Sequence, residues 1–598
     1  MEFTYRKNDN STLFSSVMNP DGMNVSEPQN YVPLYHKFFS LSDKNYDSIN
    51  LNNVKYLDSV RIMKDANVFE CDVVNQNGTT CKKDVFFKYS PLLDPVKYMM
   101  GKYDTKDENV MKLPKFDTKN GHAKIRDPNN AAYVDGFFTY LTSQLYHSHG
   151  VIHALDFYGS FLANKNDFRV NIADDVEYLN DSEFFHINRS SLFEVDNAYD
   201  NGIFNFNTRK NKEKLKLETI EGDNVLELSN IEDLAELDNI FLDRNEECEK
   251  QAVVEEADLV FSFDIKECDK KDEVSSKCSS RSSVTDGKGE ESDEEDCTSE
   301  SVFSIASEDM LFATIPNFPV QVIALEKCEN TLDSLIVDKG EDMKDLEWGS
   351  MMIQVIMMLI SYQKTYGLTH NDLHTNNIMY VPTEKQFLYY RADGKHYKVP
   401  TFGRLYKIID FGRAIYKFRG NVICSDSYHQ KGDAATQYNF EPYMNDDKPR
   451  LDPNFSFDLC RLGCSLLDFF LDELEESPKD PRLAAKRVMA EWCIDDKERN
   501  VLYKTDGEER YPNFKLYKMI ARTVHNHVPL EELRKDYFER FEKVPAWDTL
   551  ETILKVEIKD KITQDYVFEI TKEIRNLSVE DWEYVQRESL NFCRQQEL

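Results

Sequence analysis

Short polar side chains crowd the segment GLTHNDLHTNNIMY, residues 367–380, between apolar ends. His370, Asp372 and Asn377 stand there in the spacing H-x-D-x-x-x-x-N, and the later apolar segment LYKII runs into a DFG tripeptide that begins at Asp410. Carboxylate and amide oxygens are the hard ligands that Mg²⁺ prefers, and a carboxylate can also orient or deprotonate a hydroxyl group. The two motifs therefore indicate a site where a metal ion and a hydroxyl group meet.

These two motifs, in this order and after a long apolar segment, resemble those of the protein kinase superfamily. The resemblance implies that Asp372 orients the attacking hydroxyl, that Asn377 and Asp410 bind Mg²⁺, and that His370 braces the catalytic loop. It also implies ATP as the donor of the phosphoryl group. The alternative is a polar loop between a helix and a strand, beside an unrelated DFG tripeptide.

Other segments resemble the remaining parts of the kinase pattern. Lys88, in DVFFKYS, stands on the third predicted strand, where the superfamily has its phosphate-binding lysine. VIALEKCENTLDSLI resembles the strand, hinge and helix that receive adenine, with the hinge from Glu326 to Cys328. FDLCRLGCSLL resembles the helix that anchors the catalytic loop, with Asp458 and Gly463 at the matching spacing.

The nucleotide end of the pattern departs from the superfamily. The segment RIMKDANVFE, between the first two predicted strands, has no glycine, so its backbone approaches phosphates less freely than a glycine-rich loop does. Phe86 shares a strand face with Lys88, because side chains alternate along a strand, and its ring could crowd a bound adenine. No glutamate is evident as the ion-pair partner of Lys88. Asp135 is the nearest acidic candidate, and the other interpretation of that residue is an exposed helix carboxylate.

The catalytic loop departs from the pattern at two positions. Asn371 replaces the usual arginine, so a phosphorylated activation loop has no obvious guanidinium to bind. His374 stands where serine/threonine kinases commonly have a lysine near the γ-phosphate, and here the loop resembles small-molecule phosphotransferases of the aminoglycoside and choline type. Two interpretations of His374 stay open: a hydrogen bond to the phosphate of a bound nucleotide, or a local hydrogen bond.

A narrower resemblance extends over roughly residues 30–540, interrupted by an acidic insertion. It is carried by the segments NNAAYVDGFFTYLTSQL, DFYGSF, HNDLHTNNIM, VPTFGRLYKIIDFGRAIY and ERYPNFKLYKMIARTVHNH. Together they resemble the divergent serine/threonine protein kinases encoded by large nucleocytoplasmic DNA viruses. This resemblance implies a bilobal kinase fold, the use of Mg-ATP, and residence in the cytoplasm of an infected cell or in a virion.

Strand and helix signals divide the chain into a strand-rich first part and a helix-rich second part. VKYLDSVRIM, ANVFECDVV and KKDVFFKYS are typical of three antiparallel strands, with the Asn-Gly of NQNGTT as a hairpin turn. The segment NNAAYVDGFFTYLTSQLYHSHG predicts a helix capped by Asn129 or Asn130. DLEWGSMMIQVIMMLISYQKTYG and FDLCRLGCSLLDFFLDEL predict further helices. Nearly everything from about residue 345 onward looks helical, apart from the hairpin-like LYYRADGKHYKV and the apolar strand at LYKII. We expect an α+β, bilobal kinase-like fold with a small antiparallel-sheet lobe and a large helical lobe.

The expected organisation has six parts. They are an N-terminal extension packing on the kinase (1–50), the first strands and helix of the sheet lobe (51–165), an insertion (166–312), the last strand of that lobe with the hinge (313–330), the helical lobe with the catalytic loop and DFG (331–545) and a C-terminal helical extension (546–598). From about residue 265 the insertion is acidic and rich in serine, so we expect it to be largely disordered. Ser292, before DEED, suits an acidophilic kinase, and the alternative role for the insertion is a solvated linker.

The composition argues against other classes of protein. A formal charge of −35 argues against a nucleic-acid binder, because affinity for a duplex rests largely on Lys and Arg. Twelve cysteines without a CxxC pair fit a reducing compartment. The N-terminus lacks the apolar core of a secretory signal, and the most apolar segment, MMIQVIMMLI, is about half the length that spans a bilayer. We therefore expect an intracellular protein with no membrane association.

The sequence favours an active serine/threonine kinase that transfers the γ-phosphoryl group of Mg-ATP to a protein substrate. One alternative is a pseudokinase or scaffold, motivated by the missing glycine loop, by Phe86 and by the missing glutamate. A second is a small-molecule phosphotransferase, motivated by the resemblance around His374. Nothing in the sequence indicates an oligomeric state.

Overall fold

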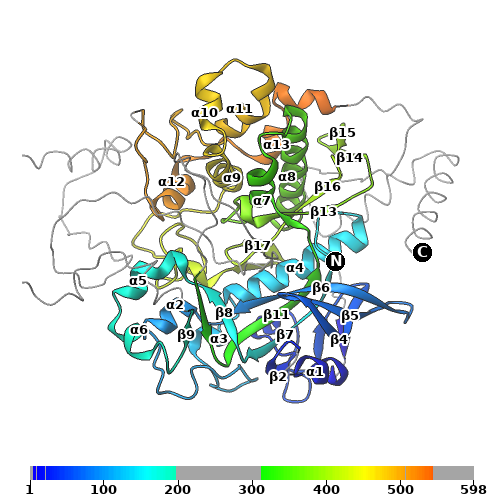
Figure 1. Cartoon of the computed structure of the whole chain (residues 1–598), viewed down its shortest axis with the longest axis vertical. Helices are drawn as coiled ribbons and strands as arrows, with labels where there is room; N and C mark the ends of the chain where they lie inside the picture. The colour runs from blue at the N-terminus through cyan, green and yellow to red at the C-terminus, as the bar shows by residue number, and fades with distance from the viewer. Residues whose placement is uncertain (1–4, 8–9, 20–21, 197–310, 506, 543–598) are drawn as a thin grey trace, which may run out of the picture.

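The computed structural model describes residues 5–7, 10–19, 22–196, 311–505 and 507–542. This part of the chain is a mixed α+β protein, in which the largest antiparallel sheet lies at one end and most of the long helices at the other (Figure 1). The predicted α+β class is confirmed. The predicted disordered segment and the predicted C-terminal extension lie outside the described residues.

A six-stranded antiparallel sheet forms the sheet-rich part. Its strands lie in the order β2 (Val25–Gln29), β7 (Phe157–Lys165), β11 (Phe318–Glu326), β6 (Thr80–Pro91), β5 (Val68–Asn75) and β4 (Lys55–Asp65). β4, β5 and β6 are consecutive in sequence, whereas β11 follows the insertion and pairs with both β6 and β7. Lys88 therefore stands on a strand that is paired on both sides.

Two tight turns join the three consecutive strands. In the turn between β5 and β6, Gly78 has a φ of 80°, a left-handed conformation that glycine adopts without steric cost. The three predicted strands and this Asn-Gly hairpin are confirmed. In the turn between β4 and β5, Asn67 follows Ala66 and has a φ of 60°. Beside that second turn, Ile62 and Met63 are 64% and 51% exposed, so the end of the hairpin extends away from the core.

Smaller antiparallel sheets lie around this frame. They are β1 (Tyr5–Lys7) with β3 (Ile49–Leu51); β8 (Phe168–Asn171), β10 (Phe312–Ile315) and β9 (Glu194–Val195); β12 (Asn330–Thr331), β13 (Ile378–Pro382) and β16 (Arg404–Ile408); β14 (Phe387–Ala392) with β15 (Lys395–Pro400); and β17 (Ile415–Phe418) with β18 (Asn421–Cys424). The hairpin at LYYRADGKHYKV and the strand at LYKII are confirmed as β14 with β15 and as β16. Asp393-Gly394, with φ angles of 51° and 76°, closes the two-residue turn of that hairpin. The broad expectation of helices after residue 345 was wrong for β13, β17 and β18.

Helices complete the core. They are α1 (Ser11–Val17), α2 (Pro95–Met99), α3 (Ala123–Arg126), α4 (Ala131–His149), α5 (Val176–Asn180), α6 (Glu183–Asn188), α7 (Leu332–Lys339), α8 (Asp345–Tyr366), α9 (Phe457–Leu467), α10 (Leu471–Glu476), α11 (Ala484–Glu491), α12 (Lys515–Thr523) and α13 (Pro529–Glu532). The segment predicted as one helix from 457 to 474 forms α9 and α10, because Phe470 leaves the helical backbone with a φ of −145°. Within the described ranges, no helix combines the length and the apolar character needed to cross a bilayer.

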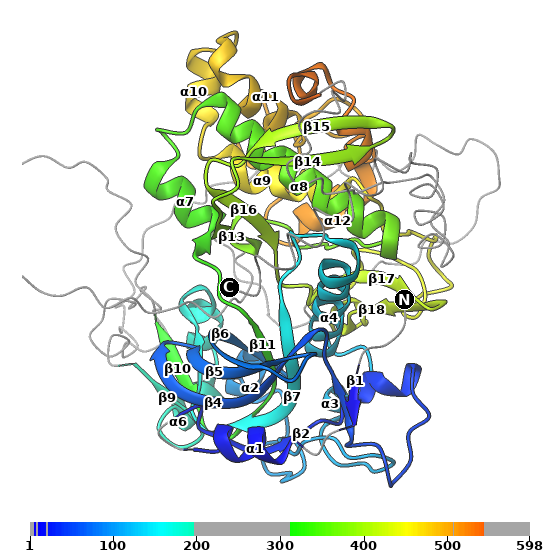
Figure 2. The same cartoon turned by 90° about the vertical axis from the view of Figure 1, so that its right-hand side faces the viewer.

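α4 lies between the sheet and the rest of the molecule (Figures 1 and 2). Of the two predicted caps, Asn130 is the one used: its side chain accepts a hydrogen bond from the N–H of Ala132 at 3.0 Å. Gly150 ends the helix in the left-handed conformation. The hydroxyl of Tyr416, on β17, donates to the carbonyl of Val134 at 3.0 Å. α4 thus joins the sheet-rich part to the segment that follows the DFG tripeptide.

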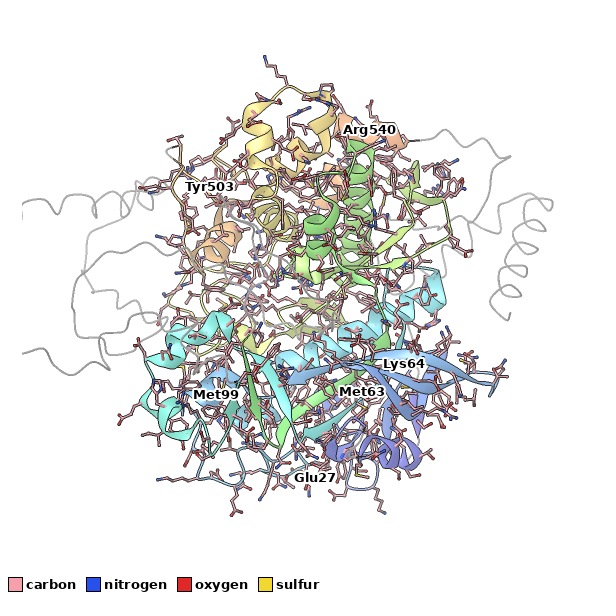
Figure 3. All side chains as sticks on the ribbon, viewed as in Figure 1. Glu27, Met63, Lys64, Met99, Tyr503 and Arg540 are labelled. Atoms are coloured by element: carbon pink, nitrogen blue, oxygen red, sulfur yellow. The ribbon has the colours of Figure 1, made fainter. Side chains whose placement is uncertain are left out.

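The two ends of the described chain pack on different parts of the molecule. β2 of the N-terminal extension pairs with β7, and the ring of Phe38 stacks on Phe137 of α4 with the centroids 5.0 Å apart. Figure 3 shows Met63 and Lys64 in the sheet-rich part, and Tyr503 and Arg540 in the helix-rich part. The N-terminal extension therefore reaches the helix that lies between the two parts.

Gly463 lies where α9 passes close to the end of α11. A Cβ atom added there would lie 2.9 Å from the Cβ of Trp492 and 3.0 Å from the carbonyl oxygen of Met489. We expect Gly463→Ala to lower the free energy of unfolding by about 1–3 kcal/mol, because this overpacking outweighs the gain in helix propensity. Urea denaturation checks this value, with Glu475→Ala on the exposed surface of α10 as the control. A Gly463→Ala protein as stable as wild type would contradict the close approach.

Candidate functional site

Lys88 forms an ion pair with two carboxylates from distant parts of the chain. Its Nζ lies 2.7 Å from Oδ2 of Asp135 and 2.9 Å from Oδ1 of Asp410. Burial alone would lower the pKa of Lys88, but the two carboxylates hold it above its ordinary value. Asp135 is only 3% exposed, so it is not the exposed helix carboxylate of the second interpretation. The structure thus identifies the acidic partner that the sequence left unassigned.

The local backbone explains how these three side chains meet. Lys88 is on β6 and Asp135 on the second turn of α4, the helix that packs on the sheet. Asp410 has a φ of 63°, which turns the chain directly after β16. The next N–H, that of Phe411, donates to Oδ1 of Asp135 at 2.8 Å. Asp135 therefore binds the lysine with one carboxylate oxygen and the DFG backbone with the other.

Burial and charge act in opposite directions on the two carboxylates. Burial raises the pKa of Asp135, against the effect of the Lys88 ammonium. Burial would also raise the pKa of Asp410, but Lys88 lowers it below its ordinary value. Lys88 therefore favours the ionised form of Asp410, which is the form in which a carboxylate can bind a metal ion.

Asp458, at the start of α9, holds the loop that contains His370. Its two carboxylate oxygens accept hydrogen bonds from the N–H groups of His370 and Asn371, at 2.9 and 2.8 Å. The N–H of Asp372 donates to Nδ1 of His370 at 3.3 Å, so Nε2 carries the ring proton and donates to the carbonyl of Ile409 at 2.9 Å. His370 therefore links the loop to the strand that leads to Asp410.

The side-chain amide of Asn377 makes hydrogen bonds through its nitrogen but not through its oxygen. Its Nδ2 donates to the carbonyl of Asp372 at 2.9 Å and bonds Nε2 of His374 at 3.1 Å. These two contacts fix the orientation of the amide. Oδ1 is buried and has no hydrogen-bond partner. A buried acceptor without a hydrogen-bond partner destabilises the folded state by about 1–3 kcal/mol. A ligand bound at this oxygen would offset that cost.

Mg²⁺ fits this arrangement of oxygen atoms. The backbone N–H of Ile409 donates to the carbonyl of Asn377 at 3.0 Å, which holds Asn377 beside the residue that precedes Asp410. Mg²⁺ is commonly bound by one or two protein oxygens, with phosphate oxygens and water completing the shell. The described residues contain no cluster of three or more His, Cys, Asp or Glu suited to a metal, so a site that depends on protein ligands alone is not found in them.

The surroundings of His374 bear on whether it bonds a phosphate or a neighbouring residue. Burial, reinforced by the nearby Arg461, lowers the pKa of His374 to about 4, although Asp372 opposes this effect. The imidazole is therefore neutral at pH 7, and its Nε2 accepts the hydrogen bond from Asn377. The structure shows the local hydrogen bond and gives His374 no positive charge.

Asp372 is surrounded by residues that the sequence did not single out. The hydroxyl of Tyr517, on α12, donates to its Oδ1 at 2.7 Å, and Nη1 of Arg413 lies 3.6 Å from the same oxygen. Nε of Arg461 donates in turn to the hydroxyl of Tyr517 at 2.9 Å. Burial would raise the pKa of Asp372, but Arg413 and its other polar neighbours lower it to about 2. Asp372 is therefore an anion throughout the neutral pH range.

Asn371 has a structural task in the loop. Its φ is 65°, a conformation that asparagine tolerates better than most residues. Its Nδ2 donates to the carbonyls of Thr369 and Arg413, each at 3.1 Å, and its Oδ1 accepts from the hydroxyl of Tyr438 at 2.7 Å. Arg413 itself belongs to the segment after DFG, and its Nη2 lies 2.8 Å from Asp433 of the same segment.

A second carboxylate fixes the same segment to α4. Oδ1 of Asp426 accepts a hydrogen bond from the N–H of Ala131 at 3.0 Å, and its other oxygen pairs with the ammonium of Lys124. The N–H of Asp426 also donates to the carbonyl of Asn129 at 2.7 Å. A negative charge is favourable at this position, because the N–H groups of a helix N-terminus are directed toward it. No kinase-type motif marks Asp426 in the sequence.

The predicted hinge residues are not part of the Lys88 cluster. The carboxylate of Glu326 pairs with the buried ammonium of Lys407 and accepts from the N–H of Asp156 at 3.1 Å. Burial raises the pKa of the Cys328 thiol to about 12, so it stays neutral. Phe86 is half-buried on the same strand as Lys88, two residues away. The turn between β4 and β5 is formed by Ala66 and Asn67 and contains no glycine, as the sequence indicates.

Comparison with known proteins leaves the family of this chain open. No family model matches it. It is similar to an uncharacterized protein of Caenorhabditis elegans, with 24% identity over 106 residues, which are 17% of this chain and 36% of that protein. The chain thus covers about a third of that relative's length.

Proposed function

We propose that this chain is a protein kinase that transfers the γ-phosphoryl group of Mg-ATP to a serine or threonine hydroxyl of a protein. In this proposal the sheet-rich and helix-rich parts are the two lobes of a kinase-like fold, similar to the divergent kinases of large nucleocytoplasmic DNA viruses. The reacting groups lie between them, on β6, on α4 and on the loops before β13 and after β16.

One observation carries the proposal: Lys88 bridges Asp135 and Asp410 at 2.7 and 2.9 Å. Phosphoryl transfer by a protein kinase needs a strand lysine paired with a helix carboxylate and a DFG aspartate placed to bind Mg²⁺, and these contacts are consistent with both. The unpartnered Oδ1 of Asn377 supports the proposal, because it supplies a second hard oxygen on a residue whose backbone bonds Ile409, the neighbour of Asp410.

Each residue has a defined role in the proposed step. Asp372 accepts a hydrogen bond from the substrate hydroxyl and takes its proton, while Lys88 holds the phosphates of the nucleotide. The hydroxyl oxygen forms a bond to the γ-phosphorus, and the bond from that phosphorus to the β,γ-bridging oxygen breaks, with its electron pair leaving on ADP. Mg²⁺, when bound by Asn377 and Asp410, neutralises charge on the phosphates.

A nucleotide-binding scaffold without transfer is the second candidate. It is favoured by Phe86, which is half-buried beside Lys88, and by the turn at Ala66 and Asn67, which lacks glycine. Both features affect how a nucleotide is placed, and neither removes a reacting group. We therefore prefer the enzyme.

The test is transfer of radiolabel from [γ-³²P]ATP with Mg²⁺ to casein and to the protein itself, by wild type and by Asp410→Ala. We expect labelled protein from wild type and only background from the variant. Equal labelling by both proteins would overturn the proposal. Parallel reactions with sugars, amines and choline test the small-molecule alternative, and phosphate that appears only on those compounds would favour it.

A further inference from the structure

The immediate surroundings of Asp372 pose an electrostatic problem for phosphoryl transfer. Asp372 is ionised, and Asp410 and Asp433 add further carboxylates to the same region. The phosphoryl group must nevertheless come within bonding distance of a hydroxyl that Asp372 holds. Besides Lys88 and Mg²⁺, a cation placed at the point of transfer would stabilise this approach of like charges.

Other charged or basic groups near the site have different tasks. The Nε2 of His374 bonds Asn377. Lys88, paired with Asp135 and Asp410, holds the phosphates of the nucleotide in the proposed step. Arg461 donates through Nε to the hydroxyl of Tyr517, and its guanidinium lies 5.1 Å from the centre of that ring. Arg461 thus acts on Asp372 through Tyr517.

Arg413 has the required geometry. Its Nη1 lies 3.6 Å from Oδ1 of Asp372, which is within ion-pair range but longer than a hydrogen bond. Its other terminal nitrogen, Nη2, is anchored on Asp433 at 2.8 Å. The guanidinium also lies 5.5 Å from the centre of the Tyr517 ring. The plane of the group is therefore fixed from two sides, while Nη1 is beside the carboxylate that orients the hydroxyl.

The backbone of Arg413 is held as firmly as its side chain. Its carbonyl accepts hydrogen bonds from the hydroxyl of Tyr428 at 2.8 Å and from Nδ2 of Asn371 at 3.1 Å. Asp372 and Asp433 hold the pKa of Arg413 well above its ordinary value, against the effect of burial. A fixed and permanently charged donor loses little entropy when it binds a phosphoryl oxygen.

We propose that Arg413 is a catalytic residue, whose Nη1 donates to an oxygen of the transferred phosphoryl group beside Asp372. It takes over the task of binding the phosphoryl group that one interpretation gave to His374. The ligand class is a phosphoryl group in transit, so the effect is greatest in the transition state. This inference rests on the proposed kinase activity.

The experiment measures kcat and the KM for ATP of wild type, Arg413→Met, Arg413→Ala and Asp433→Asn. Removal of one donor to the transition state typically costs 10²–10³-fold in kcat, so we expect a loss of about that size in Arg413→Met with little change in KM. Asp433→Asn removes the anchor but keeps the guanidinium, so its loss is expected to be much smaller. Added guanidinium ion is expected to raise the rate of Arg413→Ala and not that of wild type.

The outcomes separate this inference from the proposed function. Absence of transfer by wild type would overturn both. Transfer by wild type that persists in Arg413→Met would overturn only the role of Arg413. Equal losses in Arg413→Met and Asp433→Asn, without rescue by guanidinium, would show that Arg413 merely anchors the segment after DFG, and would likewise overturn the inference.

Discussion

Asp372→Asn is expected to lower kcat for phosphoryl transfer by about 10²–10⁴-fold, the usual contribution of a general base. The amide has the shape of the carboxylate and can still accept the hydrogen bond from Tyr517, so the loop should keep its conformation. The amide cannot take the hydroxyl proton. Because Lys88, Asn377 and Asp410 are untouched, the affinity for Mg-ATP should stay close to that of wild type. Steady-state kinetics and nucleotide titration measure the two quantities.

The pKa of Asp372 predicts how stability and kcat respond to pH. Arg413 and its other neighbours lower that pKa to about 2, below the ordinary value of an aspartate. A depressed carboxylate pKa contributes stability that is present above the unfolded pKa and is lost as the pH falls toward about 2. The kcat of wild type should therefore show no titration of Asp372 between about pH 5 and 8. Glu508→Gln, at an exposed carboxylate, is the control. A variant at Asp372 with full activity would contradict its role.

Asp135→Ala is expected to lower the free energy of unfolding by about 3 kcal/mol, near the lower end of the cost of breaking a buried ion pair. Lys88 would keep Asp410 as a partner, which limits the loss. The N–H of Phe411 would also lose its acceptor and become a buried, unsatisfied donor. Transfer activity should fall as well, because Asp135 holds both Lys88 and the DFG backbone. Urea denaturation gives the change in stability.

Two further variants make the Asp135 result specific. Asp135→Asn keeps an oxygen that can accept from Phe411 but removes the charge that binds Lys88, so it separates the two contributions. Glu508→Ala removes one partner of an exposed ion pair with Lys504, 2.9 Å apart, and should change stability by less than about 1 kcal/mol. If Asp135→Ala were no more destabilising than Glu508→Ala, the buried ion pair would not hold the site together.

The candidate residues could be selected from the sequence because the proposed chemistry imposes their spacing. Asp372, Asn377 and Asp410 stand in motifs, and Lys88 stands on a strand whose apolar alternation is strong. The structure brings Lys88 and Asp410 into contact and joins Asn377 to the strand before Asp410. The order of the sheet could be only partly predicted, since β11 pairs with β6 and β7 across more than a hundred residues of insertion.

The residues around Asp372 were beyond prediction for a physical reason. Tyr517 comes from a helix 145 positions away in the sequence, and its contact with Asp372 depends on how α12 packs against α9. Arg413 is adjacent to the DFG tripeptide but belongs to no motif. Asp135 was weighed as a candidate, yet a helix carboxylate alone gives no sign of whether it is buried. The contacts and burial of Tyr517, Arg413 and Asp135 all depend on long-range packing.

In the proposed mechanism Lys88, Asn377 and Asp410 form one magnesium–nucleotide site, on which the other roles depend. Thermal unfolding with ATP, in Mg²⁺ or in EDTA, tests it for wild type and for Asp410→Ala. A ligand at a hundredfold excess over its Kd stabilises the folded state by about 2.7 kcal/mol. We predict a clear rise in Tm for wild type with Mg-ATP, a smaller rise with ATP in EDTA, and none that depends on Mg²⁺ in Asp410→Ala. No rise for wild type at millimolar Mg-ATP would contradict the account.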